Sequence, residues 1–179
     1  LIEYVQTTGL ETLPFTPELR QWQARVELVR TVTGDKTWPD VSSKHLLACL
    51  DDWLGPYLEP VNLLSHFKKL DLKSILTAQL TWEQNQYLNQ LAPQRLQVPS
   101  GSSYAIDYTT TPPVLAVKLQ EMFGCDETPA VLHGQIPLTV HLLSPAGRPL
   151  QVTQDLAGFW QTSYQDVRKE MKGRYPKHP

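Results

Sequence analysis

The fold of this chain is decided by residues 137–153, which read PLTVHLLSPAGRPLQVT. Apolar and polar side chains alternate from Pro137 to Leu143, which is the period of a β-strand with one buried face. Residues 144–147 are turn formers that reverse the chain, and residues 148–153 return as a partner strand. This stretch therefore predicts an antiparallel hairpin.

Similar patterns lie on both sides of this hairpin. Residues 96–98 and 104–108 have strand character and are joined by a loop that contains Gly101, which predicts a second hairpin. Residues 155–160 and 163–173 have helical patterns, so the chain is expected to end in helices, the last of them stopping at Gly173.

The stretch between the two hairpins can be interpreted in two ways. Pro112 and Pro113 resemble a helix start, and Leu115, Leu119 and Met122 follow at helical spacing, so we expect a helix that ends at Gly124. The alternative is a strand over residues 114–119, because Val, a β-branched residue, recurs there.

Residues 1–92 have the pattern of several short helices. Thr16 and Pro17 predict the start of the first long helix, and Gly34 predicts its end. Thr81 and Gln84 fit a capping box, which opens the last of these helices. Further helices are predicted over residues 42–54, around Val61 to Phe67, and from Asp71 to Leu80.

These patterns predict an α+β fold: an N-terminal array of short helices followed by a β-rich half with antiparallel hairpins and C-terminal helices. The boundary is placed at Pro93, which gives a helical subdomain at 1–92 and a mixed α/β subdomain at 93–179 with a basic C-terminal helix and tail. The tryptophans at helix-core spacing are expected to be buried, namely Trp22, Trp53 and Trp82.

Charge is unevenly distributed along the chain. The formal net charge is −2, but residues 166–179 hold five basic and two acidic side chains, so this end carries +3 and residues 1–165 carry −5. The asymmetry points to an anionic partner, although cations near a helix C-terminus also complement the helix dipole. The candidate nucleic-acid-binding residues are Arg168, Lys169, Lys172, Arg174, Tyr175 and Lys177, with Tyr164 as a further ring that could stack on a base.

The sequence contains no catalytic or metal-binding motif that we recognise. Residues 34–37 include a Gly and a Lys-Thr pair but lack the spacing of a phosphate-binding loop, so they predict a turn. Asp51 and Asp52 are adjacent on a helix, where their side chains diverge instead of forming an acid–base pair. His133 and His141 are interpreted as structural residues. We therefore expect no catalytic residue, metal or cofactor in this chain.

Compartment and membrane association follow from simple counts. Cys49 and Cys125 form no CxxC pair, and we expect two free thiols in a cytoplasmic protein. No apolar run approaches the roughly 20 residues that span a bilayer, so no membrane partner is expected.

Beyond these patterns, long segments of the chain resemble the C-terminal region of the bacterial DExH-box ATP-dependent helicase family HrpB. The resemblance is strongest over residues 142–160 and extends through residues 167–178. The other segments that agree are residues 9–15, 19–26, 52–54, 96–102 and 112–124.

The resemblance implies a parent enzyme that hydrolyses ATP with Mg²⁺ and remodels or translocates on RNA or single-stranded nucleic acid. It also implies that the catalytic motifs lie in two RecA-like domains outside this chain, so whether the chain contributes to enzyme activity is left open.

Two functions are compatible with these observations. The first is a non-catalytic accessory domain whose basic end binds nucleic acid for the parent helicase. The second is a protein-interaction or regulatory platform that docks on the helicase core of the same chain or on another protein, which the acidic remainder of the chain favours. A stabilising cap without a ligand is a third option.

Overall fold

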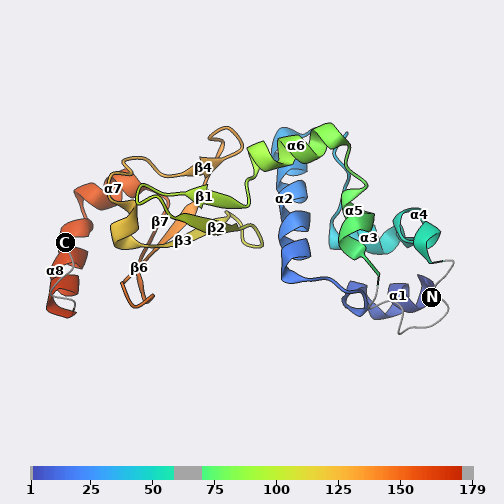
Figure 1. Cartoon of the computed structure of the whole chain (residues 1–179), viewed down its shortest axis with the longest axis horizontal. Coiled ribbons are helices and arrows are strands. Elements are labelled where there is room, and N and C mark those ends of the chain that lie inside the picture. The colour runs from blue at the N-terminus through green and yellow to red at the C-terminus, as the bar shows by residue number, and fades with distance from the viewer. Residues whose placement is uncertain (1, 59–69, 175–179) are drawn as a thin grey trace. The chain divides into compact units, whose positions relative to one another are not determined.

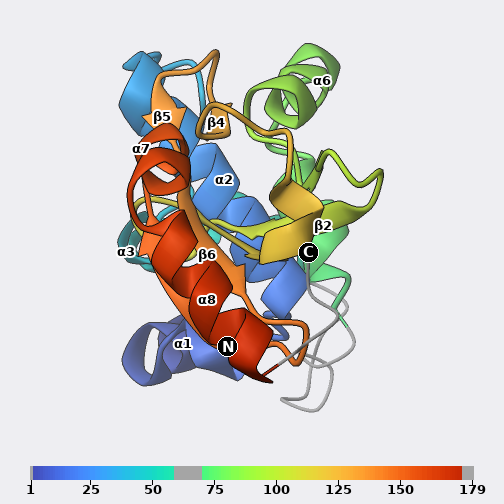
Figure 2. The same cartoon turned by 90° about the vertical axis from the view of Figure 1, so that its left-hand side faces the viewer.

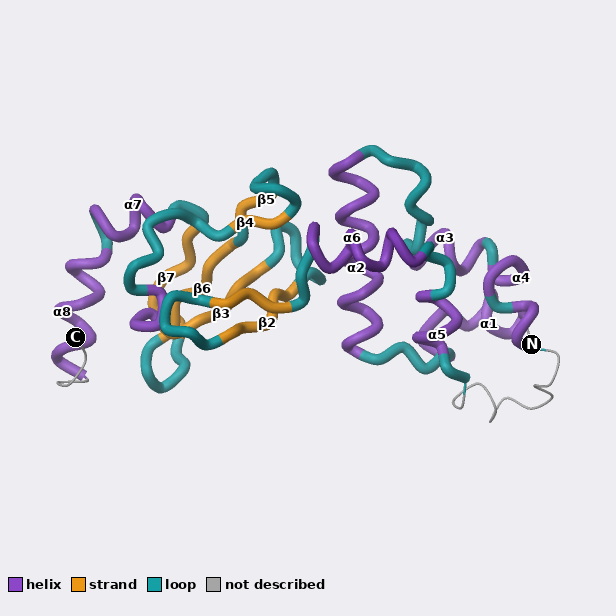
Figure 3. Tube along the Cα trace, turned by 45° about the horizontal axis from the view of Figure 1, so that its top comes forward, coloured by secondary structure: helices purple, strands orange, loops and turns teal. Residues whose placement is uncertain are grey.

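A computed structural model describes residues 2–58 and 70–174 and divides the chain into two compact units, Leu1–Gln90 and Leu91–Pro179. The first is helical and is called the helical unit, whereas every described strand lies in the second, the sheet unit (Figure 3). The expected α+β class is therefore confirmed. No helix in the described ranges is long and apolar enough to cross a membrane.

The longest helix of the helical unit, α2 (Pro17–Thr33), has the predicted ends. The Thr16 hydroxyl accepts a hydrogen bond from the backbone N–H of Leu19 at 3.1 Å. Gly34 closes the helix with a φ of 67°, a left-handed conformation that glycine adopts without a steric penalty. The other helices that include residues of this unit are α1 (Ile2–Thr8), η1 (Leu10–Thr12), α3 (Ser43–Ala48), α4 (Leu50–Trp53), η2 (Gly55–Tyr57), α5 (Leu72–Thr77) and α6 (Trp82–Leu91).

The prediction of one helix over residues 42–54 is wrong, because the chain forms α3 and α4 with a break at Cys49. The indole Nε1 of Trp53 donates a hydrogen bond of 2.8 Å to the carbonyl of Leu46. In a continuous helix that carbonyl would accept from the N–H of Leu50. A side-chain hydrogen bond thus replaces a backbone bond of the helix.

The prediction that all three tryptophans are buried is partly wrong. Trp22 and Trp53 are buried, but Trp82 is 72% exposed. Trp82 lies six residues before the buried Leu88 on α6, and six residues correspond to about 120° around a helix, so the two side chains lie on different faces. The helix predicted around residues 61–67 lies outside the described residues.

The main sheet has the strand order β1-β2-β3-β6-β7, and β4 and β5 form a separate antiparallel pair (Figure 1). The predicted hairpins are confirmed as the antiparallel pairs β1–β2 and β6–β7. Between them, β3 and β6 run parallel, which no pattern in the sequence predicts. The strands are β1 (Arg95–Gln97), β2 (Ser103–Asp107), β3 (Val114–Lys118), β4 (Ala130–Val131), β5 (Ile136–Pro137), β6 (Thr139–Leu143) and β7 (Pro149–Thr153).

The prediction of a helix after Pro112 is wrong, and the alternative prediction of a strand is confirmed. Residues 114–118 form β3, which pairs with β2 on one side and β6 on the other. Leu115 and Val117 are fully buried, whereas Ala116 and Lys118 are exposed, which is the two-residue period of a strand. The helical spacing of Leu119 and Met122 corresponds only to the short 3₁₀ helix η4 (Leu119–Met122) that follows.

The two faces of the sheet differ in burial. One face is buried and carries Leu115, Val117, Val140 and Leu142. The two C-terminal helices, α7 (Leu156–Gln161) and α8 (Tyr164–Arg174), follow β7 (Figure 2) and contribute the buried residues Leu156, Phe159 and Met171. The opposite face, called the open face, carries Ala116 and Val152, which are exposed, and His141 and Leu143, which are half-buried.

Candidate nucleic-acid interface

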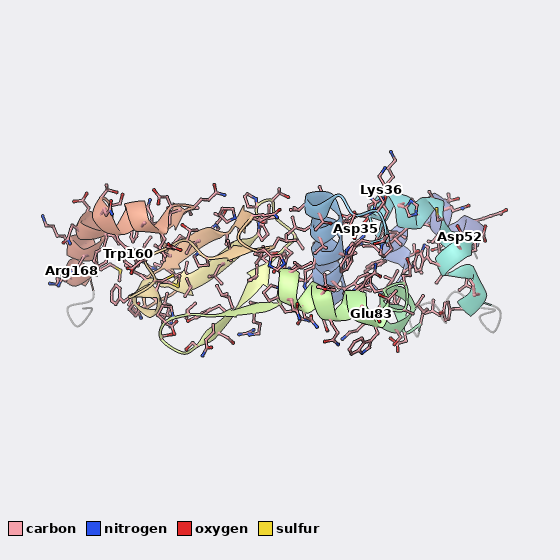
Figure 4. All side chains as sticks on the ribbon, turned by 90° about the horizontal axis from the view of Figure 1, so that it is seen from above. Asp35, Lys36, Asp52, Glu83, Trp160 and Arg168 are labelled. Carbon is pink, nitrogen blue, oxygen red and sulfur yellow. The ribbon has the colours of Figure 1, made fainter. Side chains whose placement is uncertain are left out.

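Helix α8, which carries most of the predicted site, is held against α7 by an aromatic cluster. Tyr164 lies edge-on to Trp160 with ring centroids 5.1 Å apart, and it also contacts Phe123 at 5.9 Å and Phe159 at 6.0 Å. The indole Nε1 of Trp160 donates a hydrogen bond of 2.7 Å to the carbonyl of Cys125. Figure 4 shows Trp160 on α7 and Arg168 on the neighbouring α8. Tyr164 therefore packs within the protein and fixes the rotation of α8.

This rotation sets which α8 side chains reach solvent. Met171 is 1% exposed, and Arg168 is half-buried, with its Nε buried and without a hydrogen-bond partner. Lys169 and Lys172 are exposed and lie three residues apart, which places them on neighbouring positions of the helix surface. The carboxylates Asp166 and Glu170 are exposed on the same helix, so its solvent side carries mixed charge.

The remaining predicted site residues are described only in part. Arg174 is the last residue of α8, but its side chain lies outside the description, as do Tyr175 and Lys177. The helix continues through Gly173, so the predicted stop at that residue is wrong.

The ion pairs between described residues lie in the helical unit. Within the described ranges, all three pairs lie in the helical unit: Arg30 with Asp40, His45 with Asp40, and Lys73 with Glu18. In the sheet unit, by contrast, none of these three ion pairs involves the described side chains of Lys118, Arg148, Lys169 or Lys172. The exposed cations of that unit that form no ion pair with a described carboxylate are Arg95, Lys118, Arg148, Lys169 and Lys172. Of these, Arg95 donates side-chain hydrogen bonds to the hydroxyl and the carbonyl of Ser103 at 3.0 and 2.7 Å.

Two of these cations, Lys118 and Arg148, are not candidate site residues in the sequence. The sequence predicts a helix around Lys118 and the start of a returning strand at Arg148, so no pattern predicts that they lie close together. The parallel register pairs Lys118 with Leu143, and the antiparallel register pairs Leu143 with Pro149, directly after Arg148. The Val alternation of residues 114–118 was the one signal that could have revealed this arrangement.

The other sequence features contain no site. Asp35 accepts hydrogen bonds from the backbone N–H and hydroxyl of Thr37, so residues 34–37 form the predicted turn, and Lys36 points outward (Figure 4). No group of three or more His, Cys, Asp or Glu side chains that could hold a metal ion occurs in the described ranges. Cys49 and Cys125 are free. Burial, the largest cause, raises the pKa of the Cys125 thiol.

Comparison with known proteins agrees with this architecture. The ATP-dependent RNA helicase HrpB of Escherichia coli (strain K12) is 42% identical over 179 residues, which cover 99% of this chain and 22% of that protein. A crystal structure of the E. coli DExH-box NTPase HrpB matches 100% of this chain and 22% of its own with a TM-score of 0.91 at 41% identity. A crystal structure of the E. coli DEAH/RHA helicase HrpB matches 99% of this chain and 23% of its own, with a TM-score of 0.81 at 40% identity.

The chain thus spans about a fifth of the length of these relatives. Residues 53–179 match the family model described as HrpB_C, ATP-dependent helicase C-terminal. This match covers more than half of the chain, from the last residue of α4 through all the described strands to the C-terminal helices. The chain belongs to the HrpB_C family and is a C-terminal domain of an ATP-dependent helicase.

Proposed function

We propose that this domain is a non-catalytic accessory part of an RNA helicase and that its sheet unit adds a nucleic-acid contact to the parent enzyme. The observation that carries the proposal is a set of exposed cations that form no ion pair with a described carboxylate and, unlike Arg95, no described side-chain hydrogen bond: Lys118, Arg148, Lys169 and Lys172. Phosphates attract such cations, and binding releases the counterions condensed on the nucleic acid.

The catalytic chemistry belongs elsewhere in the parent enzyme. ATP and Mg²⁺ would need a phosphate-binding loop and acidic metal ligands, and the described residues of this chain provide neither. The helicase core of the same polypeptide is the proposed partner that binds them. We further propose the cytoplasm as the compartment, because two free thiols are typical of reducing environments.

The test is a fluorescence-anisotropy titration of the 179-residue chain with labelled single-stranded RNA at two salt concentrations. Binding is expected to weaken as salt rises, with a slope of roughly 0.7 log units of affinity per log unit of salt for each phosphate contact. Lys169→Gln with Lys172→Gln measures the share that α8 contributes, and circular dichroism checks that the variant is folded.

The second candidate function, a protein-docking platform, is favoured by exposed aromatic side chains in the helical unit. Trp82 is 72% exposed and Tyr87 is 56% exposed, both on α6, and Tyr57 and Tyr4 are 45% and 43% exposed. Aromatic residues are enriched at protein interfaces. Absence of RNA binding at low salt would reject the nucleic-acid proposal in favour of docking, with the helicase core as the next partner to test.

A further inference from the structure

The open face of strands β3, β6 and β7 carries basic and apolar side chains without a carboxylate, whereas α8 contains Asp166 and Glu170. Two rows of residues cross these strands: Ala116, His141 and Val152 form one row, and Lys118, Leu143 and Pro149 form the next. Neither β3, β6 nor β7 contains an Asp or Glu. The open face therefore combines basic side chains with apolar side chains.

The basic groups gather toward one end of this face. Lys118 ends β3, and Arg148 directly precedes β7, two strands away, so their backbones lie about 10 Å apart. The turn before Arg148 is fixed, because the N–H of Arg148 donates to the Ser144 hydroxyl at 3.1 Å and the N–H of Ser144 donates to the Arg148 carbonyl at 2.8 Å. His141 lies one row inward and offers at least one N–H donor in either protonation state.

The nearest acidic group on a neighbouring strand lies toward the other end of the face. Asp107 on β2 pairs with Val114, the first residue of β3, which is four residues or about 13 Å from Lys118. Its carboxylate also accepts hydrogen bonds from the backbone N–H and the hydroxyl of Thr109. The cationic end is therefore not neutralised by this group.

The apolar side chains of the open face are small or medium in size and are accessible to solvent. Ala116 is exposed, Leu143 is half-buried, and Val152 is 53% exposed, one of the few large hydrophobic side chains of the described residues that remain in solvent. A flat apolar strip suits the face of a nucleobase, and flanking cations suit the phosphates that join such bases.

We propose that this open face is the principal RNA-binding surface of the domain: a single strand lies across β3, β6 and β7, its bases on Ala116 and Val152 and its phosphates at Lys118 and Arg148. The inference rests on the proposed function and assigns the location of the RNA-binding surface. A single strand fits better than a duplex, because only unpaired bases can lie flat on a sheet. It fits better than a peptide because an extended peptide adds to a sheet edge rather than to its face.

The test compares two pairs of substitutions in the 179-residue chain, titrated with a labelled oligouridylate of about 12 nucleotides. Lys118→Gln with Arg148→Gln is expected to weaken binding and to reduce the salt slope by roughly 1.4, the value for two lost phosphate contacts. The matched control is Lys36→Gln with Lys44→Gln, which removes two exposed cations from the helical unit. The control should leave the slope unchanged.

A third variant separates the contribution of the apolar side chains to binding from that of the cations. Val152→Ser is expected to weaken binding severalfold without changing the salt slope, because it removes apolar contact and no charge. Amide chemical shifts measured during the same titration should change along β3, β6 and β7, which locates the surface without any substitution.

The outcomes separate this inference from the function on which it rests. If the unmodified chain fails to bind at low salt, the proposed function is wrong and this inference falls with it. If the chain binds but the open-face pair behaves like the control pair, and the shifts map to α8 or the helical unit, the location is wrong while the function stands. Binding of an acidic peptide with equal affinity would also overturn the choice of RNA.

Discussion

Asp40 shows how one carboxylate organises the polar side of the helical unit. Its Oδ1 accepts a hydrogen bond from the backbone N–H of Ser42 at 3.0 Å, and its Oδ2 lies 3.9 Å from both Arg30 Nη1 and His45 Nδ1. The backbone hydrogen bond from Ser42 is the main cause that lowers the pKa of Asp40, and the nearby Arg30 and His45 side chains lower it further, against burial, which raises it.

A lowered pKa in the folded state makes stability depend on pH. The ionised Asp40 stabilises the fold above the pKa of the unfolded chain, and this stabilisation is lost as the pH falls through the lower folded-state pKa. We expect Asp40→Asn to cost about 1 kcal/mol of unfolding free energy at pH 7, with a difference from the unmodified chain that shrinks in acid. Urea unfolding at several pH values measures this.

Asp52→Asn is the control for this prediction, because Asp52 is an exposed carboxylate on α4 without an ion pair in the described residues. It should change stability little at any of these pH values. A deficit of Asp40→Asn that stays constant from neutral to acidic pH would show that the side chain acts through packing and not through its charge.

At the scale of elements, α6 is the helix whose start is best defined by side chains. The Gln84 Oε1 accepts from the N–H of Thr81 at 3.0 Å, the Thr81 hydroxyl accepts from the N–H of Gln84 at 3.1 Å, and Gln84 Nε2 donates to the carbonyl of Thr37 at 3.0 Å. Gln84 thus both caps α6 and joins it to the segment after α2.

We expect Gln84→Ala to lower the unfolding free energy by about 1 kcal/mol, because it removes one half of the capping box and the bond to Thr37. Gln86→Ala is the matched control, since Gln86 is exposed on the same helix and its side chain forms no hydrogen bond with the described residues. It should be neutral or slightly stabilising, because Ala has the higher helix propensity. Equal effects in chemical denaturation would show that the capping box contributes nothing.

Elements fixed by local chemistry are those that the sequence predicts. The starts of α2, α5 and α6 follow from Thr16, Asp71 and Thr81, whose side chains cap neighbouring backbone groups. The two hairpins likewise follow from short turns. In contrast, the partners of β3 are distant in sequence, so its parallel pairing with β6 does not follow from a local pattern, although the recurrence of Val does indicate a strand. The break at Cys49 depends on a hydrogen bond from the indole of Trp53, which helical periodicity does not reveal.

The candidate site divides in the same way. The basic character of α8 is visible in the sequence, because Lys169 and Lys172 follow one another along a single helix. The juxtaposition of Lys118 and Arg148 is not visible, because it depends on the parallel register of β3 and β6. A site built across strands can be found only after the strand order is known.

At the scale of the whole molecule, each unit has its own core. Leu46, Leu50 and Leu54 are fully buried in the helical unit, as are Leu115 and Leu142 in the sheet unit. Units with separate cores can open independently, each with its own free energy. This separation would let the sheet unit bind a ligand without a rearrangement of the helical unit.

Leu142→Ala tests this independence, because it opens a cavity in the sheet unit at an expected cost of roughly 2–5 kcal/mol. Hydrogen exchange followed by mass spectrometry should show faster exchange in β3 and β6 and unchanged protection in α2. Leu50→Ala is the reciprocal variant and should reverse the pattern. Loss of protection from hydrogen exchange in both units after either substitution would mean that the chain unfolds as one cooperative body. A ligand bound to the open face would then also stabilise the helical unit.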